Sequence, residues 1–233
     1  MPLLSIEHLS KAYAVHRAGR RARACDDVNL SVRQGEAVSI KGRSAGSAAA
    51  VLRCIWGTDS PDGGRILYDS ERFGLMDLRA ADQRKMRYLR THELGYVSLF
   101  PYVPSSWTAY DAVLKSALRA FGASERERSE QETERVLRRF GVSEHLWKTH
   151  PSKFSARDRL RLGFAIAMAR RPRLLLVDGS AEALDDTLRE DVRRLAGRVG
   201  EQNVAMLCAV REPAPSEDPF PMFSVLKRKG EGC

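Results

Sequence analysis

The sequence predicts an α/β fold, on three observations. Residues 38–56, VSIKGRSAGSAAAVLRCIW, run from an apolar strand through a loop of small residues into a helix from about Ala48. LLLVDG (174–179) and VAMLCAV (204–210) are continuous apolar runs, which are typical of strands buried on both faces of a sheet. Residues 108–147 have a helical period and predict a separate helical lobe.

Local patterns place the other elements along the chain. We expect strands at 3–7, 28–32, 36–41, 65–69, 94–100 and 222–229, and helices at 78–90, from 152 or 155 to Pro172, and at 183–200. The arginine-rich stretch 17–23 reads as a basic loop between two strands. We expect one domain over residues 1–233, with the helical lobe inserted at about 101–152.

The composition is 43% hydrophobic and 30% charged over 233 residues, which suits one domain with a sizeable core. No apolar run approaches the roughly 18 residues that a membrane helix needs, and the first residues lack the pattern of a signal peptide. The four cysteines form no C-x-x-C pair, as in reduced cytosolic proteins. We therefore expect a cytoplasmic protein without direct membrane insertion.

The net charge of +9 leaves three interpretations open. In order of preference, these are arginines that are merely solvated, an acidic protein partner, and a nucleic acid. The basic stretches 17–23 and 78–90 do not interleave aromatic residues as a nucleic-acid stacking surface would.

The loop after residues 38–40 has the layout of a phosphate-binding loop but lacks its functional residues. A working loop reads G-x-x-x-x-G-K-[ST], with the lysine on the phosphates and the hydroxyl on magnesium. Counting from Gly42 places Ser47 at the second glycine, Ala48 at the lysine and Ala49 at the hydroxyl. Ser47 restricts the backbone where glycine would permit positive φ. The backbone N–H groups of residues 45–49 still favour an anion.

The order of segments resembles the nucleotide-binding subunit of ABC transporters over about residues 3–212. Within that superfamily it most resembles the L subunit of the phosphonate carbon–phosphorus lyase system. Three segments carry the resemblance: LRCIWGTDSPDGGRI, RKMRYLRTHELGYVSLFPYVPSSWTAYDAV and SEHLWKTHPSKFSARDRLRLGFAIAMARRPRLLLVDGSAEALD. The resemblance implies a P-loop NTPase-like ABC nucleotide-binding domain with an antiparallel β subdomain and an inserted helical lobe.

Substitutions fall on the motif positions of that family. Leu99 replaces the glutamine, Gly179 replaces the glutamate base after Asp178, and Arg211 replaces the switch histidine. The signature S-G-G-x-Q reads Ser155-Ala-Arg157-Asp-Arg.

The resemblance assigns nucleotide contacts and a magnesium ligand but no catalytic residue. Tyr13 stands where the family stacks an aromatic ring on adenine, or else is a strand-edge tyrosine. Asp178 stands at the magnesium position, or else caps a turn at the end of its strand. ATP and magnesium are the implied cofactors, and the substitutions predict that binding is weak. The implied nucleotide contacts are Tyr13, Gly42, Ser44, Ala45, Gly46, Ser47, Ala48, Ala49, Ala50 and Ser155.

The substitutions predict a subunit without ATPase activity. A positioned general base contributes about 10²–10⁴ in rate, or about 3–5 kcal/mol of barrier, and Gly179 has no side chain to replace it. We therefore expect a non-catalytic structural or regulatory component of a phosphonate carbon–phosphorus lyase system. Two alternatives stay open: an ATP-binding subunit that hydrolyses ATP with an intact partner, and a nucleic-acid-binding protein that uses a basic face.

Protein subunits are the expected partners, in an ABC-type dimer or a larger complex. Arg157 and Arg161 lie four residues apart, on one face of the helix after Ser155. We expect an acidic partner surface to relieve the repulsion between these two charges. Arg157 is also expected to block a partner's phosphate rather than bind it.

Overall fold

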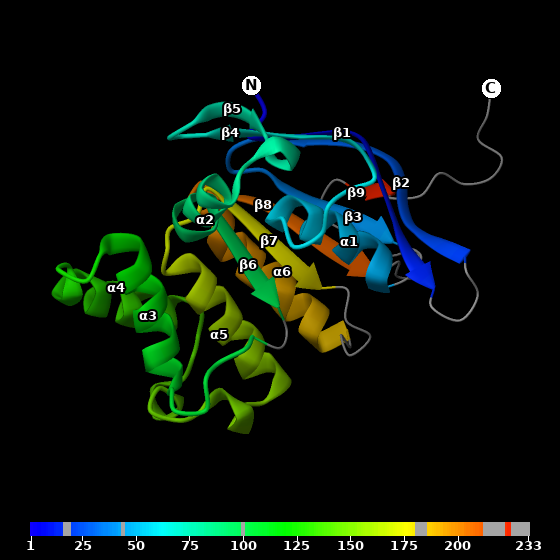
Figure 1. Cartoon of the computed structure of the whole chain (residues 1–233). Coiled ribbons are helices and arrows are strands. Elements are labelled where there is room, and N and C mark those ends of the chain that lie inside the picture. The colour runs from blue at the N-terminus through cyan, green and yellow to red at the C-terminus, as the bar shows by residue number, and fades with distance from the viewer. Residues whose placement is uncertain (16–19, 43–44, 99–100, 180–185, 212–221, 225–233) are drawn as a thin grey trace.

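The computed structural model describes residues 1–15, 20–42, 45–98, 101–179, 186–211 and 222–224 (Figure 1). Within these ranges the chain forms two sheets and a group of helices. In the view of Figure 1 the smaller sheet lies above the larger one, and the helices α3 and α4 lie at the left.

The larger sheet is parallel and confirms the α/β prediction. Its order is β6 (Leu94–Ser98), β7 (Leu174–Gly179), β8 (Ala205–Arg211), β3 (Ala37–Gly42) and β9 (Met222–Ser224). In register, Gly42 pairs with Arg211, and Asp178 lies between Ser98 and Ala209. The carboxyl ends of four strands therefore meet at one edge, the position where open α/β sheets place their ligands.

The smaller sheet is antiparallel, in the order β2 (Arg20–Val32), β1 (Leu4–Val15), β4 (Gly63–Ser70) and β5 (Gly74–Asp77). The expectation of a basic loop at 17–23 was wrong for residues 20–23, which pair with β1 as strand β2. Two arginines of this hairpin are ion-paired, Arg21 with Asp62 at 2.7 Å and Arg23 with Asp26 at 2.5 Å. The arginines beside the turn gave residues 20–23 the composition of a loop. Their pairing with β1 makes them a strand, and the sequence does not show that pairing.

Six α-helices complete the described fold. The helix α1 (Ala45–Trp56) follows β3, and α6 (Asp186–Gly200) leads to β8. The predicted helix at 78–90 is a short 3-10 turn (Leu78–Ala80) followed by α2 (Gln83–His92). The interruption arises because Asp82 caps α2 through an acceptor bond from Lys85 N, 2.8 Å. The remaining three are α3 (Ala109–Phe121), α4 (Arg126–Arg139) and α5 (Ala156–Met168).

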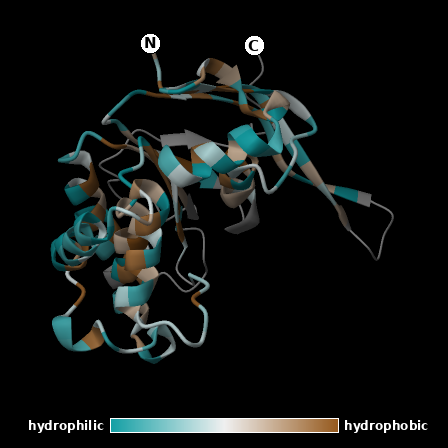
Figure 2. Ribbon diagram, turned by 60° about the vertical axis from the view of Figure 1, so that its left-hand side comes forward, coloured by the Kyte–Doolittle hydropathy of each residue, from teal (hydrophilic) through white to brown (hydrophobic). Residues whose placement is uncertain are grey.

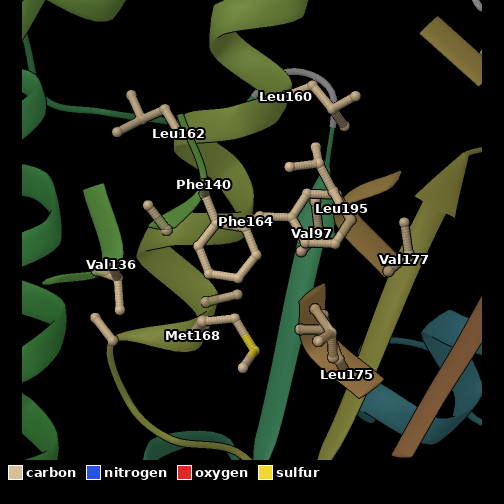
Figure 3. Close-up of a cluster of buried hydrophobic side chains, with 14 of the residues drawn as sticks. Val97, Val136, Phe140, Leu160, Leu162, Phe164, Met168, Leu175, Val177 and Leu195 are labelled. Carbon is tan, nitrogen blue, oxygen red and sulfur yellow. The ribbon is translucent and has the colours of Figure 1, made fainter. Parts of the chain in front are cut away.

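Two buried clusters form the core. One joins α3 and α4 to the sheet through α5; its Phe140 and Phe164 rings stack 5.8 Å apart, with Val97 and Leu175 of the sheet in the same cluster (Figure 3). Gly163 allows α5 to lie close to β6, since a Cβ there would be 3.2 Å from the Ser98 carbonyl oxygen. The other cluster joins the smaller sheet and α1 to the strands.

Hydrophobic residues are concentrated where helices and strands pack against one another, and the helix at the left edge is mostly hydrophilic (Figure 2). Among the described helices, none has the length and apolar character that crossing a membrane requires.

Candidate nucleotide site

The candidate site lies at the carboxyl edge of the parallel sheet, where β3 passes into α1. Gly42 is the last residue of β3, and Ala45 and Gly46 begin α1. Ser44 and Leu99 lie outside the described residues. The start of α1 and the end of β7 therefore lie at the same edge of the sheet, with β8 between β3 and β7.

The first turn of α1 is packed into the core. Ser47 is 3% exposed, and Ala48, Ala49 and Ala50 are 0%, 2% and 0% exposed. Ala48 belongs to the same buried cluster as Val38, Ile40 and Leu52. Methyl groups thus fill the positions where the loop motif would carry an ammonium group and a hydroxyl.

Tyr13 is held by its hydroxyl in a three-residue cluster at the edge of the smaller sheet. The Tyr13 hydroxyl donates to Asp59 Oδ2. Arg53 of α1 donates to both partners, from Nη2 to the Tyr13 oxygen at 2.9 Å and from Nε to Asp59 Oδ2 at 3.0 Å. Burial and the bond to Asp59 raise the pKa of Tyr13 to about 12. Although burial opposes it, hydrogen bonding from Tyr13 and Arg53 holds the pKa of Asp59 below its usual value.

This cluster ties β1 to the end of α1 and to the turn that follows it. The Arg53 guanidinium also lies 5.7 Å from the centre of the Tyr13 ring. The sequence predicts neither Arg53 nor Asp59, because their 40- and 46-residue separations from Tyr13 carry no local pattern.

Asp178 is bound by the neighbouring strand. The Tyr96 hydroxyl of β6 donates to Asp178 Oδ2 at 3.1 Å. Burial and the Asp178 charge raise the pKa of Tyr96, so this donor keeps its proton. Within the described ranges no three His, Cys, Asp or Glu side chains gather as a metal site. Asp178 would therefore be a single carboxylate ligand, without the hydroxyl that Ala49 replaces.

The N-terminus of α5 keeps polar residues but engages them within the chain. Ser155 caps the helix: its Oγ accepts from Asp158 N at 3.1 Å and donates to Asp158 Oδ2 at 2.6 Å. The carboxylate of Asp158 therefore sits in the first turn, where a helix N-terminus would otherwise attract an anion.

The expectation that Arg157 and Arg161 repel each other and await an acidic partner was wrong. Arg157 Nε forms an ion pair with Asp191 Oδ2 of α6, although the N–H is not directed at the oxygen as a hydrogen bond requires. Arg161 donates to the Gly141 carbonyl at 3.2 Å and lies 3.7 Å from Asp158. Sequence spacing shows only that the two arginines share one helix. Their partners Asp191 and Gly141 lie on other segments of the chain, so the spacing does not reveal them.

The described residues do not fit a magnesium–triphosphate. Such a ligand needs a cation on its phosphates and oxygen ligands for the metal. The first turn of α1 supplies buried alanines instead, and Gly179 at the end of β7 has no side chain. What remains is a set of backbone N–H groups and one carboxylate.

A family model described as ABC transporter matches residues 25–182. Methionine import ATP-binding protein MetN 2 of Pseudomonas syringae pv. tomato is 29% identical over 200 residues, which are 86% of this chain and 57% of that protein. Histidine/lysine/arginine/ornithine transport ATP-binding protein HisP of Escherichia coli is 27% identical over 214 residues, 90% of this chain and 80% of that protein. The chain thus spans just over half the length of the MetN relative.

Solved structures share the fold. The dimeric ATP-binding cassette MJ0796, in a post-hydrolysis state with ADP and phosphate, has a TM-score of 0.75 at 23% identity, over 90% of this chain and 88% of that one. The protein cbiO1 from Clostridium perfringens has a TM-score of 0.71 at 21% identity, over 91% and 79%.

Proposed function

Because this chain belongs to the ABC transporter family, with the α/β fold of its nucleotide-binding domains, we propose that it is the cassette subunit of a multi-subunit assembly and that its own site does not hydrolyse ATP. The observation that carries this proposal is that Ala48 and Ala49, at the start of α1, are buried. They occupy the positions at which the phosphate-binding loop motif has its lysine and its hydroxyl.

An import assembly is the setting that the relatives support best. MetN 2 and HisP are named for import of methionine and transport of basic amino acids. The phosphonate carbon–phosphorus lyase setting gains no support from these relatives, and it stays a prediction of the sequence. The family likewise gives no support to a nucleic-acid partner.

A second candidate is an ATP-binding subunit that hydrolyses ATP together with an intact cassette. The names of the relatives favour this candidate, because each is called an ATP-binding protein. The site disfavours it on both sides. The chain's own site lacks the cation at α1 and the base at the end of β7, and at α5 the side chains of Ser155 and Arg157 are engaged within the chain.

Measurements of ATP turnover and nucleotide binding test the proposal. The purified chain is expected to show no steady ATP hydrolysis above background and only weak binding of a fluorescent ATP analogue. The control is Asp178→Ala, which removes the remaining carboxylate. A rate of about 1 s⁻¹, a low ordinary kcat, that disappears in the Asp178→Ala variant would overturn the proposal. Stimulation of an intact cassette's turnover by this chain, but not by the variant, would favour the second candidate.

A further inference from the structure

The hairpin of β1 and β2 is fixed to the turn that joins α1 to β4. From β1, Lys11 Nζ donates to the Ser60 carbonyl at 2.7 Å. The N–H of Ala12, on the same strand, donates to Asp62 Oδ2 at 2.6 Å. From β2, Arg21 Nη2 donates to Asp62 Oδ1 at 2.7 Å. Both strands of the hairpin therefore hold this turn, through main-chain and side-chain donors.

The Tyr13 cluster, which consists of Tyr13, Arg53 and Asp59, closes the same junction. The single hydroxyl proton of Tyr13 is donated to Asp59, and the hydroxyl oxygen accepts from Arg53. Arg53 also donates to Asp59 at 3.0 Å. The polar end of Tyr13 is thus engaged within the chain both as donor and as acceptor.

Two cations lie over the Tyr13 ring. Lys11 Nζ is 5.2 Å and the Arg53 guanidinium 5.7 Å from the ring centre, which are distances of cation–π attraction. Lys11 is held there by the Ser60 carbonyl. Arg53 is held by Asp59. A base that stacks on this ring would have to compete with cations that are already fixed in place.

We infer that Tyr13 is a structural latch between the hairpin and α1, and that the candidate nucleotide site does not select adenine over other bases. The groups that favour an anion at this site are the backbone N–H groups at the start of α1, which contact phosphates and not bases. ATP, GTP and inorganic triphosphate should therefore bind with similarly weak affinity. This departs from the base-stacking role that the resemblance implies for Tyr13. It deepens the proposed function and rests on it for the weak binding of phosphates.

Thermal denaturation with millimolar ligand tests the base selectivity. The ligands are ATP, GTP, inorganic triphosphate and adenosine, at equal magnesium concentration and ionic strength. The first three are expected to shift the midpoint to the same extent, and adenosine is expected not to shift it. Equal shifts support the inference even at zero, because adenine then contributes nothing. A larger shift with ATP than with GTP and triphosphate, lost in Tyr13→Ala, would overturn it.

Tyr13→Phe separates the latch from a stacking ring, because it removes the hydroxyl and keeps the aromatic face. The latch predicts that this variant lowers the denaturation midpoint by about 2–4 °C, as expected for the loss of about one hydrogen bond in a chain of this length. Tyr110→Phe is the matched control. Tyr110 is also half-buried, and the described residues give its hydroxyl no hydrogen bond, so its midpoint should stay close to that of the wild type.

Two results with these variants would contradict the inference. A midpoint of Tyr13→Phe equal to that of Tyr110→Phe would mean that the hydroxyl does not hold the hairpin. A shift by ATP that survives in Tyr13→Phe and disappears in Tyr13→Ala would assign the ring to a base. ATP hydrolysis without base preference would overturn the proposed function and leave this inference standing, whereas adenine selectivity without hydrolysis would do the reverse.

Discussion

The first turns of α1 and α5 are both helix N-termini, and each corresponds to a phosphate-facing motif in the resemblance. They differ in the fate of their polar groups. In α1, Ala48 and Ala49 carry no polar side-chain atom and are buried. In α5, Ser155 and Arg157 keep polar atoms, but Asp158 and Asp191 of the same chain engage them. The start of α1 lacks polar side-chain groups, whereas the start of α5 keeps them and binds them to carboxylates of the same chain.

The difference has an energetic consequence. Buried methyl groups contribute to the free energy of unfolding through apolar burial, about 0.8 kcal/mol per methylene-sized group. At α5 the contribution comes from the hydrogen bonds between Ser155 and Asp158 and from the ion pair between Arg157 and the buried Asp191 carboxylate. Restoring nucleotide contacts would therefore require adding groups at α1 and releasing groups at α5.

The largest expected effect is at the α5 end, on removing Arg157. Asp191 has a side chain only 9% exposed, and Arg157→Ala would leave it buried without its ion-pair partner. Breaking such a pair costs about 3–5 kcal/mol, and the half-exposed arginine places the loss near 3 kcal/mol. Chemical denaturation of both proteins measures it.

The double variant Arg157→Ala with Asp191→Ala is the control. It removes both charges, so it is expected to be more stable than Arg157→Ala alone, as in a double-mutant cycle with favourable coupling. Equal stability of wild type and Arg157→Ala would mean that Arg157 is not held by Asp191 and is available to a partner.

The next effect is at the α1 end, on adding groups. Ala48→Lys with Ala49→Ser is expected to raise ATP affinity about tenfold, because a charge-assisted bond to phosphate contributes about 1.5–3 kcal/mol. Turnover should stay absent, since Gly179 still supplies no base. The larger side chains should also lower stability by about 1–3 kcal/mol, because both positions are buried. Calorimetry of ATP binding and denaturation give the two quantities.

Ala48→Met with Ala49→Ser separates charge from size. Methionine fills a volume similar to that of lysine without the ammonium group, so stability should fall comparably while ATP affinity stays unchanged. If the lysine variant also binds no better than wild type, the start of α1 no longer presents its N–H groups to a phosphate.

Local patterns predicted most of the fold. The apolar runs at 174–179 and 204–210 became β7 and β8, because a strand buried on both faces needs an unbroken apolar sequence. The strand β5 (Gly74–Asp77) was missed, since its four residues are all exposed or half-exposed and carry no periodic signal. The hairpin at residues 20–23 was missed because its strand character comes from pairing with β1.

The sequence predicted where β3 passes into α1, but not the contacts around that turn. Small residues from Gly42 to Ala50 marked the strand-to-helix loop. The bond from Tyr96 to Asp178 joins residues 82 positions apart, and it depends on the register of β6 and β7.

The smallest effect distinguishes a structural cap from a free hydroxyl at Ser155. Thr108 caps α3 with the same geometry: its Oγ1 accepts from Asp111 N at 3.1 Å and donates to Asp111 Oδ2 at 2.7 Å. If Ser155 acts only as a cap, Ser155→Ala and Thr108→Ala should each lower stability by about 1 kcal/mol. Denaturation curves of the two variants test this, with Thr108 as the matched control in the lobe. Should Ser155→Ala leave stability unchanged while Thr108→Ala lowers it, the Ser155 hydroxyl is not engaged by Asp158. In that case α5 could still offer a donor to a partner cassette, and the contrast between the two helix ends would fail at α5.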